Sequence, residues 1–234
     1  MLTYRRHGVL GTYVTPPIGR YPFSFNFTWT LTKRRFLDAM SVFLFRWGSK
    51  PAFLKAPVWK VKRSAIITQA KALHRTMGEA LAAGDKAALR QTCVPRLASK
   101  LSSAIDARRR GTRKSWELVR YNQSLRYPRL ADHKLRVTVH PQHKNLPAVY
   151  QAVVTIASRQ RLVEYDDSKT GAGKAVPGSE KEVDLVENVV LMSLVDPDTY
   201  EQGPWMIWGT MNETTKAGLE YEEATITQLQ SMPQ

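Results

Sequence analysis

Five cations near the middle of the chain are its clearest candidates for chemistry. Arg108, Arg109, Arg110, Arg113 and Lys114 lie within one short stretch of seven residues. The planar guanidinium group of arginine suits paired hydrogen bonds to phosphate oxygens. Cations also stabilise the C-terminal end of a helix, but one helix end does not require five of them. This cluster therefore predicts a surface that contacts the phosphates of a nucleic acid.

Nine further cations precede this cluster and are candidates for the same kind of contact. Residues 1–37 contain six of them and no acidic residue. The other three lie where a long helix is expected to begin, a position at which the helix dipole disfavours positive charge. Their placement favours an anionic partner. The nine residues are Arg5, Arg6, Arg20, Lys33, Arg34, Arg35, Lys60, Lys62 and Arg63.

The charge is unevenly distributed along the chain. Residues 1–130 hold 26 Lys and Arg against 5 Asp and Glu, whereas residues 131–234 hold 9 against 15. Such asymmetry predicts one surface for a polyanion and another that faces solvent or a different partner. Nucleic acid and an anionic membrane are the two polyanions to consider.

Signatures of catalysis and of metal or nucleotide binding are weak. Residues 170–174 (TGAGK) resemble a phosphate-binding loop but lack its first glycine and the Ser or Thr that would bind magnesium. His140 and His143 have no neighbouring cysteines or clustered carboxylates, so we expect them to face solvent. Cys93 adjoins no catalytic signature, and a single cysteine excludes an internal disulfide. We expect no enzymatic activity, no metal and no cofactor.

The N-terminal segment is predicted to be an extended tail. Aromatic residues alternate with polar ones over residues 21–29, and several prolines interrupt residues 1–37. We expect a partner to hold this basic tail; the alternative is a tail folded back onto its own domain. Residues 36–47 predict a short, strongly apolar helix that ends near Gly48 and is buried in an assembly or lies on a bilayer.

Three helices are predicted after the tail. The first runs from Pro57 to Gly84, the second covers residues 86–93 with Asp85 as its cap, and the third starts at Pro95. Apolar residues recur at helical spacing along the first helix. Its predicted core face comprises Ile66, Ala70, Leu73, Met77 and Ala80.

From residue 116 onward the apolar spacing changes to alternation, which is typical of strands. The predicted strands cover residues 116–121, 135–140, 149–165, 183–195 and 205–211. The last two form a hairpin across a turn-rich link. The side chains expected to point inward are apolar and indicate a filled core: Leu135, Val137, Val139, Trp205 and Ile207.

Helices followed by consecutive strands predict an α+β fold. We expect helices packed on a curved antiparallel sheet, a cone-like or cystatin-like roll, with an extended basic N-terminal tail. Residues 1–56 would form the basic extension with its short apolar helix. Residues 57–212 would form the α+β domain, and residues 213–234 an exposed acidic tail.

Several stretches resemble a known family. Residues 80–85 with Leu89 and residues 95–97 are similar to its helix pair, and residues 116–119 and 204–209 to its first and last strands. The family is the C-terminal domain of the motor-anchoring subunit of the mitochondrial inner-membrane presequence translocase. The same superfamily includes a mitochondrial large-subunit ribosomal protein related to the inner-membrane ribosome receptor. The basic extension resembles this ribosomal branch more than the translocase branch.

This resemblance implies a function without catalytic residues. The chain would be a component of the mitochondrial large ribosomal subunit near the polypeptide exit tunnel, in the matrix and peripheral to the inner membrane. Its partners would be large-subunit rRNA, neighbouring ribosomal proteins and the inner-membrane surface or insertase, and it would not form a homo-oligomer. The alternatives are a presequence-translocase module without RNA and a cone-fold enzyme.

Overall fold

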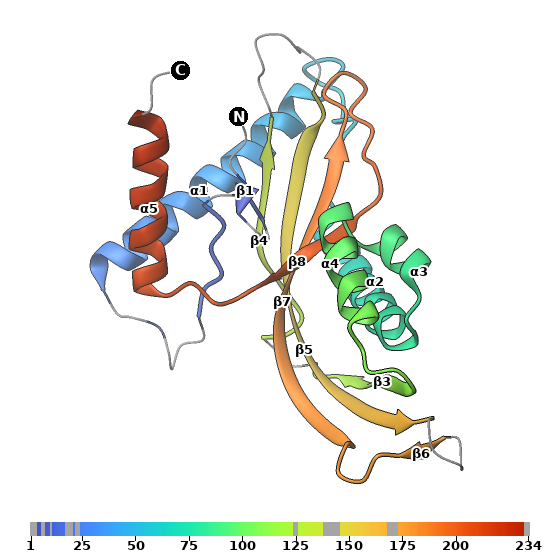
Figure 1. The fold of residues 1–234 in the computed structure, drawn as a ribbon. Helices are drawn as coiled ribbons and strands as arrows, with labels where there is room; N and C mark the ends of the chain where they lie inside the picture. Colours follow the sequence, from blue (N-terminus) through green and yellow to red (C-terminus); the bar gives the residue numbers. More distant parts are fainter. Residues whose placement is uncertain are drawn as a thin grey trace.

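The computed structural model describes residues 4–5, 8–9, 11–16, 21, 24–123, 126–137, 146–167 and 173–231. Within these residues, five helices pack against a six-stranded antiparallel sheet, which confirms the predicted α+β class (Figure 1). A small separate pairing joins β1 (Tyr4–Arg5) to β2 (Gly8–Val9).

The helices are α1 (Phe25–Gly48), α2 (Arg63–Ala83), α3 (Lys86–Thr92), α4 (Pro95–Asp106) and α5 (Lys216–Ser231). The predicted caps between α2 and α3 are confirmed. Gly84 ends α2 in the left-handed conformation at φ 78°, which glycine adopts at little cost. The carboxylate of Asp85 accepts hydrogen bonds from the amides of Ala87 (2.9 Å) and Ala88 (3.0 Å) at the start of α3.

The sheet is built around β5 (Ala148–Asp166), which pairs with β7 (Lys181–Val195) along most of its length. The first half of β5 also pairs with β4 (Arg129–Arg136), and its second half with β3 (Thr112–Tyr121). β7 also pairs antiparallel with β8 (Met206–Met211), so the predicted C-terminal hairpin is confirmed. β6 (Lys174–Ala175), which was not predicted, pairs with the last two residues of β5.

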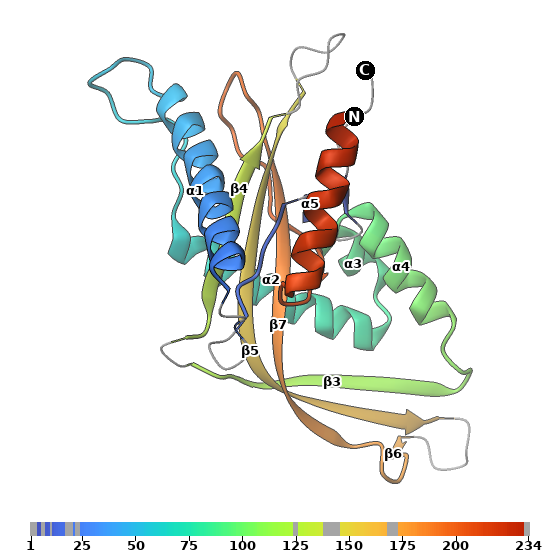
Figure 2. The ribbon, with the colours of Figure 1, turned by 90° about the vertical axis from the view of Figure 1, so that its left-hand side faces the viewer.

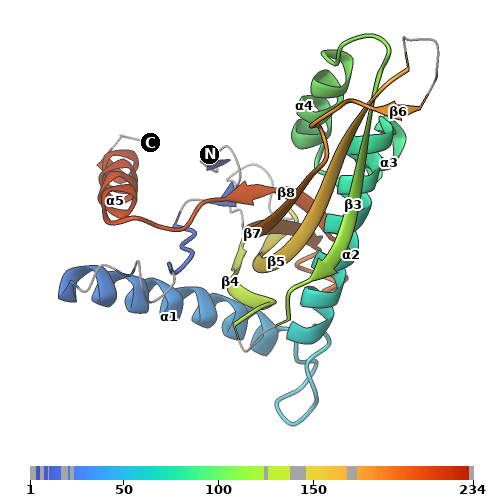
Figure 3. The same cartoon turned by 90° about the horizontal axis from the view of Figure 1, so that it is seen from below.

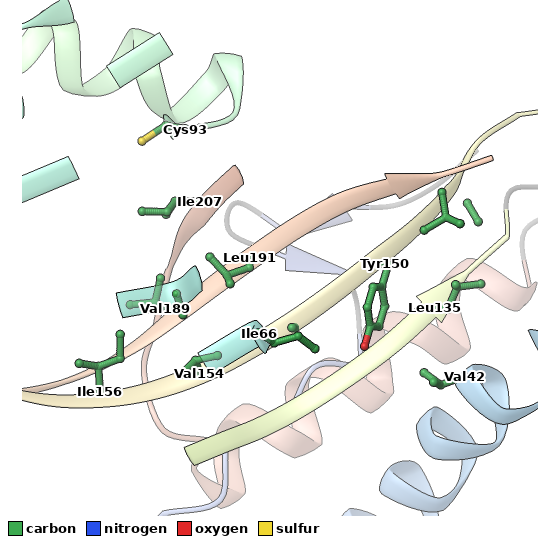
Figure 4. Packing of buried hydrophobic residues seen from close by; sticks show 14 of the residues in the cluster. Val42, Ile66, Cys93, Leu135, Tyr150, Val154, Ile156, Val189, Leu191 and Ile207 are labelled. Atoms are coloured by element: carbon green, nitrogen blue, oxygen red, sulfur yellow. The ribbon is translucent and has the colours of Figure 1, made fainter. Parts of the chain in front are cut away.

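Each face of the sheet has its own apolar cluster. On one face, α2, α3 and α4 cover a core that includes Ile66, Leu89, Cys93 and Ile207 (Figure 4). The core face predicted for α2 is confirmed, because its five residues are buried or packed against this cluster. On the other face, N-terminal residues contribute to a second cluster, which contains Val9, Val14, Val94, Ala131, Val149, Val153, Val190 and Trp208. Figure 3 shows α5 on this side, across the sheet from α2.

Two predictions about the first 60 residues are wrong. The chain is helical from Phe25, because its aromatic residues also fit a helical period that buries Phe27 and Leu31. The helix predicted from Pro57 begins instead at Arg63. Residues 57–62 are tied to the end of α1, where the amide of Trp59 donates a hydrogen bond to Oγ of Ser49 (3.2 Å).

Two predictions about later segments are also wrong. The strand expected at residues 135–140 is β4, which ends at Arg136, and Val137 is 49% exposed rather than inward. The acidic tail expected to be exposed contains α5, in which Leu219 and Glu222 are buried. Val139 and both histidines of residues 140–143 lie outside the described residues.

Candidate polyanion-binding surfaces

The predicted cations occupy different parts of the molecule. One group lies on α1, a second at or just before the start of α2, and a third in the turn between α4 and β3. Figures 2 and 3 show that this turn lies at the opposite end of the molecule from α1. Arg5 lies in β1, whereas Arg6 and Arg20 lie outside the described residues. The three groups are Lys33, Arg34 and Arg35; Lys60, Lys62 and Arg63; and Arg108, Arg109, Arg110, Arg113 and Lys114.

Arg108 has a structural partner that the sequence did not reveal. Its guanidinium donates hydrogen bonds to the backbone carbonyls of Leu81 and, at 3.0 Å, of Ala82. These carbonyls belong to the last turn of α2, where the carbonyls lack the amide donors of a following helical turn. A cation here also compensates the negative end of the helix dipole. Arg108 thus holds the α4–β3 turn against α2.

The other four cations of the α4–β3 turn reach solvent. Arg109 and Arg110 are exposed, and neither forms an ion pair within the part of the chain that the structure describes. Arg113 and Lys114 pair with carboxylates at 3.4 and 3.9 Å. Both pairs are exposed, where an ion pair contributes only about 0–1 kcal/mol. A polyanion could therefore compete for all four.

α1 has two apolar faces. One packs on the protein and buries Phe27, Leu31 and Val42. The opposite face presents large apolar side chains to solvent at steps of four and seven residues, so they form a single stripe. These residues, called the α1 stripe below, are Phe25, Trp29, Phe36, Phe43 and Trp47, with exposures between 46% and 82%.

The loop after α1 extends this exposed apolar surface. Phe53 is 77% exposed and its ring contacts that of Trp47, with the centroids 6.0 Å apart. Leu54 is 93% exposed. Nζ of Lys50 lies 3.7 Å from the centroid of the Trp47 ring, a cation–π contact. Aromatic side chains flanked by cations are typical of surfaces that bind membranes or other proteins.

A buried cluster of charges fixes α1 to the sheet. Nζ of Lys134 in β4 lies 3.0 Å from Oδ2 of Asp38 in α1 and 3.3 Å from Oδ2 of Asp132. The same ammonium donates a 2.6 Å hydrogen bond to the carbonyl of Gly11. Burial raises the pKa of Asp38, and the charge of Lys134 opposes this shift. The cluster thus joins three segments that are distant in sequence.

The N-terminal residues 9 and 11–16 fold back onto the protein rather than extend toward a partner. Gln151 in β5 accepts a 2.7 Å hydrogen bond from the amide of Val9, and Glu222 in α5 accepts one of 2.9 Å from the amide of Gly11. The guanidinium of Arg35 donates to Oγ1 of Thr15. These residues therefore follow the alternative prediction, a tail folded back onto its own domain. Arg35 helps to hold them there.

A titratable pair that the sequence did not indicate lies between α2 and the sheet. Nε2 of His74 is 3.0 Å from Oε2 of Glu187, and His74 is 3% exposed. The hydrogen bond from His74 lowers the pKa of Glu187 below its ordinary value of 4.5, against the effect of burial. His74 lies on the core face of α2, where an apolar pattern gives no sign of a polar partner.

No protein-family model matches the chain, and no curated protein matches it significantly. Within the described ranges, no three His, Cys, Asp or Glu side chains are grouped so that they could hold a metal ion. None of the helices described here has the length and apolar character needed to span a bilayer.

Proposed function

We propose that this chain is a structural component, without enzymatic activity, of the mitochondrial large ribosomal subunit. It lies in the matrix near the polypeptide exit tunnel and peripheral to the inner membrane. It contacts large-subunit rRNA and neighbouring ribosomal proteins, and it tethers the ribosome to the inner membrane for insertion of nascent proteins. In this proposal the sheet is a curved, cone-like roll that carries a basic tail.

The separation of two different surfaces carries the proposal. The α4–β3 turn presents arginines without large exposed apolar side chains, which suits phosphates of RNA. The α1 stripe, at the other end of the molecule, presents aromatic rings beside cations such as Lys33 and Lys50. Rings of this kind lie at the headgroup boundary of an anionic bilayer, where each cation adds about 1 kcal/mol. A tether needs two such separate surfaces.

Two matched variants of the full chain test the assignment of these surfaces. Replacing Trp29, Phe36 and Phe43 by Ser should abolish flotation with vesicles that contain anionic phospholipid and leave binding to isolated large ribosomal subunits unchanged. The double variant Arg109→Gln/Arg110→Gln should do the reverse. Because each lost phosphate contact removes about 0.7–0.9 from the slope of log affinity against log salt, the second variant should flatten that slope by about 1.5.

Sedimentation of a matrix extract separates this function from its alternatives. Co-migration of the chain with large ribosomal subunits at moderate salt is the expected result. A pool confined to small complexes would contradict the ribosomal assignment and favour a translocase module without RNA. Equal effects of both variants on both ligands would contradict the assignment of separate surfaces while leaving ribosome binding intact.

A further inference from the structure

A cavity of about 260 Å³ lies between α2 and the strands β3, β5 and β7, next to the α4–β3 turn. Apolar side chains from both sides line it, among them Met77, Leu81, Trp116 and Leu162. Lys114 from the turn also lines it, and the neighbouring Arg109 and Arg110 are exposed. The cavity is therefore largely apolar, and Lys114, one of the cations that we assign to RNA, lies in its wall.

The polar groups of this cavity are held in fixed positions. Nε1 of Trp116 donates a 2.8 Å hydrogen bond to Oε1 of Gln160. Nε2 of Gln160 donates in turn to Oε2 of Glu187 (2.8 Å), the same oxygen that Nε2 of His74 approaches at 3.0 Å. All four side chains line the cavity. A chain of hydrogen bonds of this kind orients its members before any ligand arrives.

One nitrogen of these four hydrogen-bonded side chains has no partner among the described residues. Nδ1 of His74 is buried and forms no hydrogen bond with any residue that the structure describes. Because the ionised carboxylate of Glu187 can only accept, Nε2 of His74 donates to it, and Nδ1 is left for a further hydrogen bond. An unpaired buried polar atom is costly, so a ligand that brings a complementary hydrogen-bonding group would relieve this cost.

The position of the Trp116 ring depends on a glycine. A Cβ added to Gly78 of α2 would lie 2.8 Å from three atoms of this ring, so the indole packs directly against the helix backbone. The ring is only partly buried and lines the cavity. It is thus a rigid aromatic surface on which a flat group can stack.

We propose that this cavity accepts one unstacked base of RNA, and this inference rests on the proposed contact between the α4–β3 turn and rRNA. The base stacks on Trp116, and a polar group on its edge forms a hydrogen bond with Nδ1 of His74. Phosphates on either side of the extruded nucleotide meet Arg109, Arg110 and Lys114. RNA-binding proteins commonly take up bases from loops and bulges in this way, by stacking and by hydrogen bonds to base edges.

Short RNA probes separate the contribution of the base from that of the phosphates. Fluorescence anisotropy would compare labelled pentamers of uridine, adenosine, cytidine or guanosine with an abasic ribose-phosphate pentamer. The full-length chain should bind at least one pentamer about fivefold or more tightly than the abasic one, the lower limit for stacking of a single base on an aromatic ring. Ala82→Leu, which fills the cavity from α2, should remove this difference and leave the abasic affinity unchanged.

Two controls keep the test decisive. Ala72→Leu places the same side chain at an exposed position of α2 away from the cavity, and it should keep the base-dependent difference. With the unchanged chain, a pentamer containing 4-thiouridine should crosslink on irradiation to a residue of the cavity wall, mapped by mass spectrometry. This crosslink does not depend on how any variant folds.

The outcomes distinguish the cavity from the wider function. Ribosome binding without a base-dependent difference, or crosslinks confined to the exposed arginines, would overturn the cavity proposal alone. The fatty acid dodecanoate is a probe for a lipid ligand of this apolar cavity. Binding of dodecanoate without base-dependent RNA affinity would also overturn the cavity proposal. A base-dependent difference that Ala82→Leu removes would support the cavity even if the chain failed to sediment with ribosomes, which would refute the ribosomal proposal alone.

Discussion

Replacement of Lys134 by Met should be among the most destabilising substitutions in this chain. The side chain of Lys134 is 0% exposed, and its ammonium lies 3.0 Å from Asp38 and 3.3 Å from Asp132. Methionine keeps most of the volume but leaves Asp132 without this cation and Asp38 with only the partly exposed Arg136. Removing one partner of a buried ion pair typically costs about 3–5 kcal/mol. For a domain of this size, that corresponds to a fall in Tm of roughly 6–20 °C.

The pH dependence of this loss has a definite sign. Burial already raises the pKa of Asp38, and Lys134 opposes the shift, so removing Lys134 raises the pKa further. A carboxyl whose pKa is raised by folding stabilises the protein fully below its unfolded value of 3.8 and progressively less as pH rises through its folded value. The penalty of Lys134→Met should therefore be larger at pH 8 than at pH 5.

Urea unfolding followed by circular dichroism measures this penalty. Arg136→Met is the matched control, because Arg136 approaches the same Asp38 at 3.3 Å but is 39% exposed, and it should cost only about 0–1 kcal/mol. The double variant Asp38→Asn/Lys134→Met should recover part of the loss, since it removes one stranded charge. A penalty below 1 kcal/mol, or one independent of pH, would refute this account of the cluster.

Three further substitutions test other parts of the structure. Gly78→Ala should lower the free energy of unfolding by about 1–3 kcal/mol, because its Cβ would meet the Trp116 ring at 2.8 Å; unchanged urea midpoints would contradict this close packing. Asp85→Ala should cost about 1 kcal/mol by removing the cap of α3, measured by the same unfolding curves, and a neutral result would mean that solvent replaces the cap. The hydrogen bond from His74 holds the pKa of Glu187 below 4.5. The stabilising contribution of Glu187 should therefore persist above pH 4.5 and disappear as pH falls through the lowered pKa. Glu187→Gln should flatten this part of the stability profile, and an identical profile in the variant would assign the acid sensitivity to other carboxyls.

The sequence predicted those elements whose signals are local. The caps at Gly84 and Asp85 mark one helix end and one helix start through backbone geometry and neighbouring amides alone. The long apolar strands and the C-terminal hairpin follow from alternation over many residues. Elements that depend on distant partners were missed. β4 was misplaced because it carries Asp132 and Lys134, whose burial is possible only with Asp38 of α1 beside them.

The candidate surfaces were only partly predicted, because some of their contacts also join residues that are distant in sequence. Counting cations identified the basic α4–β3 turn, but composition could not show that Arg108 binds carbonyls of α2. The α1 stripe was overlooked because residues 21–29 fit alternation as well as a helical period, and only the helix places Phe25 and Trp29 on one exposed face. The pair of His74 and Glu187 joins residues 113 positions apart, a distance at which no local pattern carries information.

The contact between Gly11 and Glu222 sets an order for folding during synthesis. The two residues are 211 positions apart, and the second belongs to α5. A ribosome that makes this chain releases the N-terminal segment long before its last docking partner exists, because domains are completed only as their C-terminal elements emerge. Lys134 and Gln151 appear at intermediate times and can hold the segment only in part. The N-terminal segment is therefore among the last parts of the nascent chain to become enclosed, and until then it remains accessible to chaperones and proteases.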